Sequence, residues 1–413
     1  MKTRLGIFCL ATLVVLFTAC KAKEEIPGFR EDLQTGLQQL LDSAMLAYKS
    51  EVPEFPGGMA MKVIHQGNSF FVSSGMGEAV TGKIHFRAAS ITKTFTATAI
   101  LLLHQQGKLN VNDRITDTIP GTTEPYISAD PAYDIPYKES IKILDLLKHR
   151  AGVYDLVNDP VPDTLSASLP YKGYNYVDYQ TAIDSLHTFS FDELIQVLSE
   201  TGLSYFEPGR AYHYSNTGYT ILGKIIERVA NKTYQNYLME NVILPMGMTN
   251  SSFPVLGDDL ELPDPYAPGW VMYGNDVYDF SLSNVSATVA EGNLISCPDD
   301  LSLFLSELFA GQGVLNYHTV YSLMMHYLPL SEDVADGYAC GLRYMNMLGY
   351  GHTGAIAGYL SIMVSDPEMD FTVVAFTNAW NFNQGVPGLE QQVNQLLKNT
   401  CYEAKALMRN SAD

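Results

Sequence analysis

Few cysteines and few positive charges mark this chain of 413 residues. It has 25 Lys and Arg against 45 Asp and Glu, which gives a formal net charge of −20 at pH 7. A chain this acidic repels nucleic acid and anionic lipid, so we expect no direct binding to either. The cysteines form no Cys-x-x-Cys pair, which argues against a cysteine-ligated zinc site. Three of them follow the N-terminal leader, and this odd, widely spaced set allows one disulfide bridge at most: Cys297, Cys340 and Cys401.

Signatures of several enzyme classes are also missing. The sequence has no Gly-x-Ser-x-Gly turn, which disfavours an α/β-hydrolase. Its 9 histidines include no His-Glu-x-x-His and no His-x-His pattern, and no P-loop occurs. We therefore expect neither a metal nor another cofactor.

The N-terminus has the pattern of an export signal. A short basic stretch precedes the uncharged apolar run Leu5 to Thr18, which is too short to span a membrane comfortably. The run ends in a tetrapeptide that resembles a bacterial lipobox, Phe17-Thr18-Ala19-Cys20. We expect a lipoprotein signal peptide at residues 1–19, a tether at 20–30 and a lipid anchor on Cys20 in the bacterial cell envelope. The alternative is an ordinary cleaved signal with a chance cysteine.

The pattern of apolar residues predicts clustered helices and strands rather than alternating βαβ units. Two short apolar runs flank Gln66-Gly67-Asn68, as in a β-hairpin. The tyrosine-rich segment Asp155–Leu186 has no clear period and is predicted to be a surface loop or lid. Such clustering favours an α+β fold with an antiparallel sheet. The expected helices span residues 32–50, 95–104, 141–148, 191–198, 217–230 and 391–406, and the expected strands 59–64, 69–72, 361–365 and 372–377.

A serine and a lysine stand three residues apart just before the apolar helix, in the only Ser-x-x-Lys of the sequence, Ser90-Ile91-Thr92-Lys93. The i, i+3 spacing places both side chains on one helix face. At a helix N-terminus, backbone N–H groups stabilise a developing anion, and a desolvated lysine can take the proton of the serine. The pattern alone is short enough to arise by chance, so its weight depends on its context.

A tyrosine and an asparagine form the second candidate group, Tyr214-Ser215-Asn216. A tyrosine can pass protons to a leaving group, and an asparagine amide can orient a carbonyl. Tyr-x-Asn recurs at Tyr234, Tyr273 and Tyr344, but only the Tyr214 example lies in a Pro-Gly turn that leads into a predicted helix.

The third candidate group is His352-Thr353-Gly354, just before a predicted strand. A polar side chain, a hydroxyl and a glycine beside a strand edge suit the docking of an extended substrate. Taken alone, this tripeptide has a plain alternative, a loop histidine near a turn.

The order of the three groups resembles that of the serine β-lactamase and DD-peptidase superfamily. The resemblance covers about residues 33–397. Its flanking segments are Phe86–Phe95, Leu146–Gly152, Leu244–Thr249, Glu291–Leu294, Asp299–Leu301 and Phe376–Asn378. It implies a domain at residues 31–405 with an antiparallel β-sheet flanked by helices and an inserted, mostly helical subdomain at about 108–270.

The same resemblance implies roles for the matching residues. Ser90 would form the acyl-enzyme, and Lys93 and Tyr214 would move protons. The substrate-binding positions would be Asn216, which orients the substrate, His352, Thr353 and Gly354 along the strand, and Ala355, whose N–H would complete the oxyanion hole with that of Ser90.

The implied function is a serine hydrolase that cleaves an amide, peptide or ester bond. Histidine at position 352 departs from the lysine of most β-lactamases and favours a DD-carboxypeptidase-like or esterase-like enzyme. Arg150-Ala151 departs from the familiar Thr-Ser and leaves the role of that loop open. The alternatives are a β-lactamase and a catalytically silent penicillin-binding protein. An envelope scaffold that uses Asp155–Leu186 to bind partners is a further, additional role.

Overall fold

The computed structural model describes residues 29–77, 80–331, 335–382 and 389–410. The predicted signal peptide, Cys20 and most of the predicted tether lie outside the described residues. Helix α1 (Phe29–Glu51) already begins within the expected tether, and α10 (Leu389–Asn410) continues beyond the expected limit of the domain. Acidic residues in the first turn of α1 favour this start, because they complement the positive end of the helix dipole. No helix in the described part of the chain is long and apolar enough to cross a bilayer.

Eight antiparallel strands form the main sheet of the described residues, in the order β2-β1-β12-β11-β10-β9-β8-β7. The predicted α+β fold with an antiparallel sheet is therefore confirmed. Their bounds are β1 (Met59–His65), β2 (Asn68–Ser74), β7 (Leu328–Pro329), β8 (Gly337–Tyr338), β9 (Arg343–Met345), β10 (Gly349–Ile356), β11 (Tyr359–Asp366) and β12 (Phe371–Thr377).

The predicted hairpin is confirmed as β1 and β2, which pair in register from Met59 with Ser74 to His65 with Asn68. Its two turn residues both have positive φ, 48° at Gln66 and 77° at Gly67. Such a turn matches the right-handed twist of the strands.

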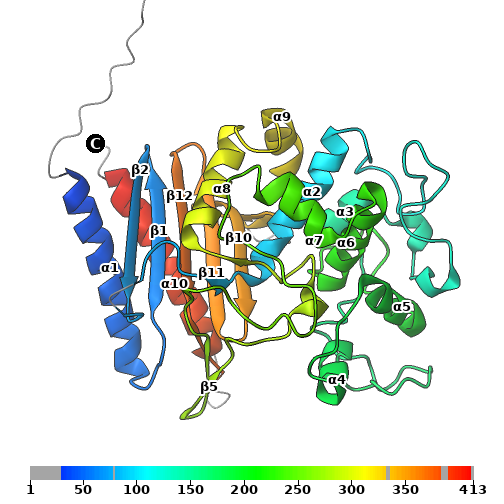
Figure 1. Ribbon diagram of the computed structural model, residues 1–413, viewed down its shortest axis with the longest axis horizontal. Coiled ribbons are helices and arrows are strands. Elements are labelled where there is room, and N and C mark those ends of the chain that lie inside the picture. The colour runs from blue at the N-terminus through cyan, green and yellow to red at the C-terminus, as the bar shows by residue number, and fades with distance from the viewer. Residues whose placement is uncertain (1–28, 78–79, 332–334, 383–388, 411–413) are drawn as a thin grey trace, which may run out of the picture.

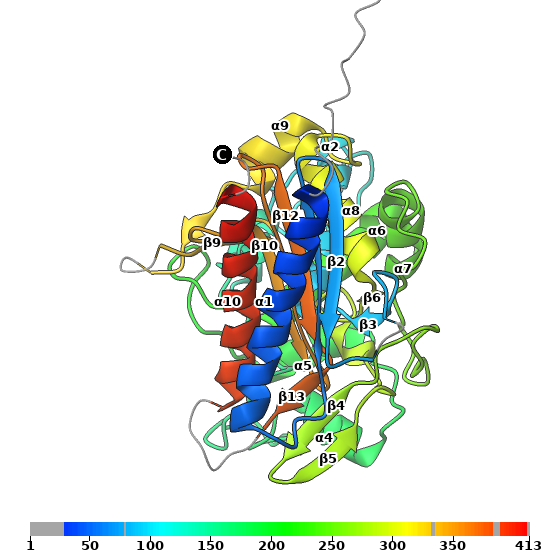
Figure 2. The same ribbon diagram turned by 90° about the vertical axis from the view of Figure 1, so that its left-hand side faces the viewer.

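Helices cover both faces of the sheet (Figures 1 and 2). Helices α1 and α10 pack on one face, against buried side chains such as Met61 and Val63. The alternate residues point to the other face, where Ala60 and Phe376 join the core beneath α8 (Pro298–Ala310) and α2 (Thr92–Gln105). Strands β1, β11 and β12 are buried on both sides because each face of the sheet has its own helical layer.

Helices make up the regular elements between α2 and the short strand β4 (Trp270–Tyr273). This is the region of the predicted helical subdomain, whose boundaries stay a prediction. The elements are α3 (Ile143–Leu147), α4 (Tyr176–Ile183), α5 (Phe191–Thr201), α6 (Asn216–Ala230) and α7 (Tyr234–Leu238), with the short helices η2 (Pro131–Tyr133), η3 (Lys138–Ser140) and η4 (Met239–Ile243).

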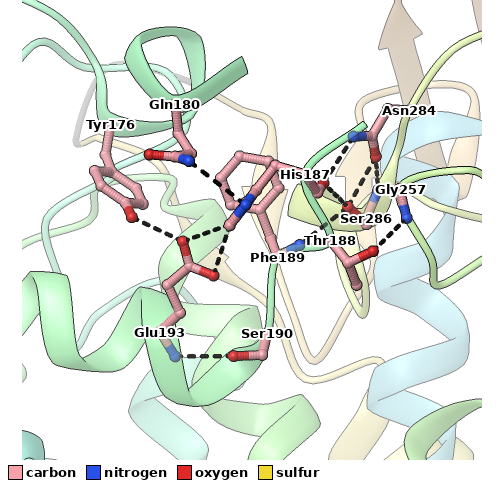
Figure 3. A network of polar contacts seen from close by, with 10 residues as sticks. All are labelled: Tyr176, Gln180, His187, Thr188, Phe189, Ser190, Glu193, Gly257, Asn284 and Ser286. Atoms are coloured by element: carbon pink, nitrogen blue, oxygen red, sulfur yellow. Dashed lines mark hydrogen bonds and ion pairs between the residues drawn. The ribbon is translucent and has the colours of Figure 1, made fainter. Parts of the chain in front are cut away.

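Most of the segment Asp155–Leu186 has irregular backbone at or near the surface, as predicted, but the prediction of a loop is wrong at its helical part. It contains α4, and the rings of Tyr171 and Tyr176 are buried. Figure 3 shows how the end of the segment is held: the hydroxyl of Tyr176 donates to Glu193 Oε1 (2.7 Å), and His187 lies 2.9 Å from the same oxygen. A tyrosine buries its ring while its hydroxyl finds a polar partner, so polarity along the sequence does not reveal this packing.

Two smaller sheets flank the main one. Strand β13 (Ala379–Asn381) pairs with β4, which pairs with β5 (Asp276–Asp279). Strand β3 (Phe86–Arg87) pairs with β6 (Ile295–Ser296) and fixes the chain just before Ser90.

Candidate active site

Ser90 lies in the short 3₁₀ helix η1 (Ala89–Ile91), which leads directly into α2. Ala89 has a φ of 49°, a left-handed conformation that costs a residue with a side chain about 1 kcal/mol or more. The turn is held by a hydrogen bond from Ala88 N–H to the carbonyl of Leu294 (2.8 Å). Ser90 is half-buried, whereas Lys93, one turn later on α2, is fully buried.

The ammonium nitrogen of Lys93 has three oxygen neighbours. It lies 2.7 Å from Asn216 Oδ1, 2.9 Å from the carbonyl of Glu291 and 3.4 Å from Ser90 Oγ. The first two oxygens can only accept hydrogen bonds. These two oxygens therefore each accept one hydrogen bond from the Lys93 nitrogen, whose third bonding direction points at the serine hydroxyl.

Tyr214 and Asn216 lie at the N-terminus of α6. Ser215 caps this helix, because its hydroxyl oxygen accepts the N–H of Gly218. The Lys93 nitrogen is 4.8 Å from the centre of the Tyr214 ring. The first two predicted motifs therefore meet at Lys93, although they are far apart in the sequence.

The predicted strand that follows His352 is confirmed as β11, but His352 itself lies fully buried inside β10, a strand that the sequence does not predict, and so is not a loop histidine. Its Nδ1 donates to the carbonyl of Thr353 (2.6 Å), which leaves Nε2 to accept from the hydroxyl of Tyr338 (3.0 Å). Burial, with a smaller contribution from Arg343 and Lys93, lowers the pKa of His352 well below its usual value. The imidazole is neutral and supplies no positive charge to the site.

Gly354 brings β10 against the segment that carries the nucleophile. A Cβ at this position would lie 2.2 Å from the carbonyl oxygen of Ala88 and 2.4 Å from Ser361 Oγ. Real side-chain carbons do not approach that closely, so the contact requires glycine. The neighbouring Thr353 is half-buried and Ala355 is exposed, and their predicted roles in substrate binding stay predictions.

Arg343 on β9 is a candidate site residue that the sequence did not indicate. Its guanidinium carbon lies 5.5 Å from the centre of the Tyr214 ring, and its buried Nε has no partner among the described residues. Together with Thr353 and Lys398 it lines a cavity of about 60 Å³. Asp336 lines the same cavity and lies 3.7 Å from Lys398 as an ion pair, so Arg343 beside the Thr353 hydroxyl is the cation that could attract an anionic group. A single arginine in a short strand carries no sequence motif that would identify it.

Two buried carboxyl groups, those of Asp155 and Glu291, lie close enough to Lys93 to interact with its charge. Asp155 accepts the N–H of Asn216 (3.2 Å) and so fixes the start of α6, and burial raises its pKa. Burial raises the pKa of Glu291 well above its usual value despite the nearby Lys93, so burial favours the protonated form of this side chain. Glu291 belongs to a segment of the predicted resemblance, whereas Asp155 was placed at the edge of the predicted lid.

The described residues contain no group of three or more His, Cys, Asp or Glu side chains that could hold a metal ion. Cys297, Cys340 and Cys401 are buried free thiols, so the single disulfide that the sequence allowed does not form between them.

Comparisons with known proteins identify the family to which the chain is similar. The family model described as Beta-lactamase matches residues 51–398. Penicillin-binding protein 4* of Bacillus subtilis (strain 168) is 30% identical over 305 residues, which cover 71% of this chain and 60% of that protein. A putative D-alanyl-D-alanine carboxypeptidase of Escherichia coli (strain K12) is 25% identical over 334 residues, which cover 73% of this chain and 70% of that protein. The match thus spans less than two thirds of the Bacillus protein.

Solved structures share the fold. A D-amino acid amidase from Ochrobactrum anthropi SV3, in complex with L-phenylalanine amide, is similar with a TM-score of 0.69 at 23% identity. The alignment covers 92% of this chain and 100% of the amidase. A D-stereospecific amidohydrolase from Streptomyces sp. is similar with a TM-score of 0.66 at 23% identity, over 84% of this chain and 94% of that enzyme.

Proposed function

The chain belongs to the Beta-lactamase family of serine hydrolases, and on that premise we propose that it is an exported enzyme that forms an acyl-enzyme at Ser90. It would cleave an amide, peptide or ester bond in the manner of a DD-carboxypeptidase or an esterase. A β-lactamase and a catalytically silent penicillin-binding protein are the alternatives, and the experiment below separates the β-lactamase from the proposed enzyme.

One observation carries the proposal: Lys93 is fully buried between Asn216 and Glu291 with its third position toward Ser90 Oγ. In its amine form, Lys93 donates two hydrogen bonds and directs its lone pair at the serine hydroxyl. That arrangement is what a general base next to a nucleophile requires.

The proposed reaction uses these groups in turn. Ser90 Oγ attacks the substrate carbonyl carbon while its proton passes to Lys93 Nζ. The bond to the leaving group breaks as Tyr214 gives its hydroxyl proton to that group, and Lys93 returns a proton to Tyr214. A water molecule then releases the acid from Ser90 by the same route in reverse. The N–H groups of Ser90 and Ala355 would hold the oxyanion.

The preferred substrate carries a free carboxylate. His352 is neutral, so the positive charge beside the catalytic groups comes from Arg343, next to Tyr214 and Thr353. A carboxylate bound there would place the adjacent amide along the edge of β10. The names of two relatives, a D-alanyl-D-alanine carboxypeptidase and a D-amino acid amidase, agree with a small D-aminoacyl substrate.

The test treats the purified protein and its Ser90→Ala variant with a fluorescent penicillin and with a fluorophosphonate, followed by mass spectrometry of the labelled peptide. Label on Ser90 from both reagents, with slow release of the penicilloyl group, supports a DD-peptidase-like enzyme. Fast release identifies a β-lactamase, and label from the fluorophosphonate alone points to an esterase. No label in a folded sample would refute the assignment of the nucleophile.

Lipid attachment through Cys20 to the bacterial cell envelope is a separate proposal that rests on the leader sequence. Metabolic labelling with a radioactive fatty acid tests it. We expect label on the wild-type chain and none on a Cys20→Ser variant, and label on both would refute it.

A further inference from the structure

His149, just after α3, bonds to the backbone on both sides of Tyr214. Its carbonyl accepts the N–H of His213 (3.0 Å), and its ring nitrogen Nδ1 accepts the N–H of Ser215 (3.1 Å). One residue thus holds the two backbone N–H groups that flank Tyr214. His149 has a φ of 54°, a left-handed conformation.

The His149 ring also supports the Tyr214 ring directly. The ring centres lie 4.2 Å apart with an interplanar angle of 37°. Tyr338 and Tyr219 pack on the same imidazole, at 4.6 Å and 5.0 Å. The imidazole is fully enclosed, so it fixes both the backbone and the ring of Tyr214.

The bond to Ser215 N–H defines one state of the imidazole. Nδ1 must be the acceptor, so the ring proton lies on Nε2, which has no hydrogen-bond partner within the described residues. Burial, and then the positive charges of Lys93 and Arg343, lower the pKa of His149 well below its usual value. The neutral ring keeps its acceptor at every pH at which the enzyme would work.

We propose that His149 is a positioning residue for proton transfer, which holds Tyr214 in place through one acceptor nitrogen and one ring face. The inference rests on the proposed function, because it assigns the role through Tyr214. His149 touches neither Ser90 nor the proposed carboxylate subsite, so it affects the chemical step and not the binding of substrate.

Two variants separate the parts of this role. His149→Asn keeps an acceptor oxygen close to the position of Nδ1, and asparagine tolerates the left-handed backbone. His149→Phe keeps an aromatic ring and loses the acceptor. Since a displacement of about 1 Å in a catalytic group costs roughly 100-fold in rate, we expect His149→Phe to lower kcat by about 100-fold with KM nearly unchanged. His149→Asn should restore at least 10-fold of that loss, roughly half of it on a logarithmic scale.

A double-mutant cycle with Tyr214→Phe gives the decisive result. If His149 acts through Tyr214, His149→Phe adds less than about 3-fold to the loss already caused by Tyr214→Phe, since effects along one route are not additive. A further loss of about 100-fold, or a rise in KM that accounts for the whole effect, overturns the proposal.

Wild-type protein provides a test that needs no variant to fold. Nitrogen-15 NMR of histidine-labelled enzyme should show His149 as the neutral Nε2–H tautomer at pH 7, and a proton on Nδ1 would overturn the proposal. Failure of the parent proposal has a different signature, because wild-type enzyme would then show no label on Ser90. Normal wild-type labelling with equal rates in His149→Phe refutes only the role of His149.

Discussion

Two glycines beside the catalytic motifs should respond oppositely to replacement by alanine. Gly354→Ala puts a methyl group 2.2 Å from the carbonyl of Ala88, two residues before Ser90. Gly218→Ala, on the first turns of α6, puts one 3.8 Å from its nearest neighbour, a side-chain carbon of Leu146. The substitution is the same, and only the local space differs.

The magnitudes follow from the contacts. An ordinary carbon contact is more than 3 Å, so Gly354→Ala must separate β10 from η1 by about 1 Å. Overpacking of this kind costs about 1–3 kcal/mol of folding free energy, and the displaced nucleophile should lose about 100-fold in acylation rate. Gly218 has a helical φ and room for the methyl group, so Gly218→Ala should stabilise the fold by about 0.5–1 kcal/mol with little change in rate.

The assay measures denaturant unfolding and the rate of labelling of Ser90 by a fluorophosphonate for the wild type and both variants. Each variant serves as the control for the other, since both glycines lie next to the proposed site. Wild-type stability and labelling in Gly354→Ala would refute the close contact between β10 and the Ala88 segment. A strongly destabilised Gly218→Ala would refute the space at α6.

Three further changes test the charged and polar groups of the site. Asn216→Asp places a carboxylate 2.7 Å from the Lys93 nitrogen and so holds Lys93 as an ammonium ion. Because an ammonium ion cannot accept the serine proton, the rate of Ser90 labelling should fall by about 100-fold or more. An active variant would exclude Lys93 as the base. Burial raises the pKa of Glu291 in the folded protein above its unfolded value of about 4.5, so folding disfavours the ionised form above that pH. Glu291→Gln should therefore leave the melting temperature unchanged near pH 4 and raise it increasingly as the pH rises from there. A constant difference would contradict the raised pKa. Arg343→Ala should raise KM at least 10-fold, about 1.4 kcal/mol, for a peptide with a free C-terminal carboxylate. The KM for the methyl ester of the same peptide should stay unchanged. Equal effects on both substrates would exclude a carboxylate subsite at Arg343.

The sequence predicts the elements of the fold that have a simple pattern of apolar residues. The helix at 32–50 corresponds to α1, whose buried residues recur at helical spacing. The strands at 361–365 and 372–377 correspond to β11 and β12, two short runs on either side of a turn that are buried almost throughout. The segment at 155–186 lacks such a pattern, since tyrosine rings enter the core and their hydroxyls bond to charged groups.

The sequence likewise predicts some residues of the candidate site and misses others. Ser90, Lys93 and Asn216 belong to short motifs, and the structure places them in contact. The sequence does not reveal that His352 is buried and neutral, because this state depends on Tyr338 and the interior of the sheet. Arg343 is missed for a related reason, since only the pairing of β9 with β10 brings it near Tyr214.

The neutrality of the partners of Lys93 has a consequence for its chemistry. Its two shortest contacts are with an amide oxygen and a peptide carbonyl, and burial favours the uncharged form of the nearby acid Glu291. A carboxylate in hydrogen-bond contact would stabilise the ammonium form and oppose release of its proton. Neutral oxygens hold the nitrogen in position without placing a full negative charge in hydrogen-bond contact with it. A buried lysine can then serve as base and acid in one cycle, provided that Asp155, the remaining acid, stays engaged with the backbone of α6 through Asn216 N–H.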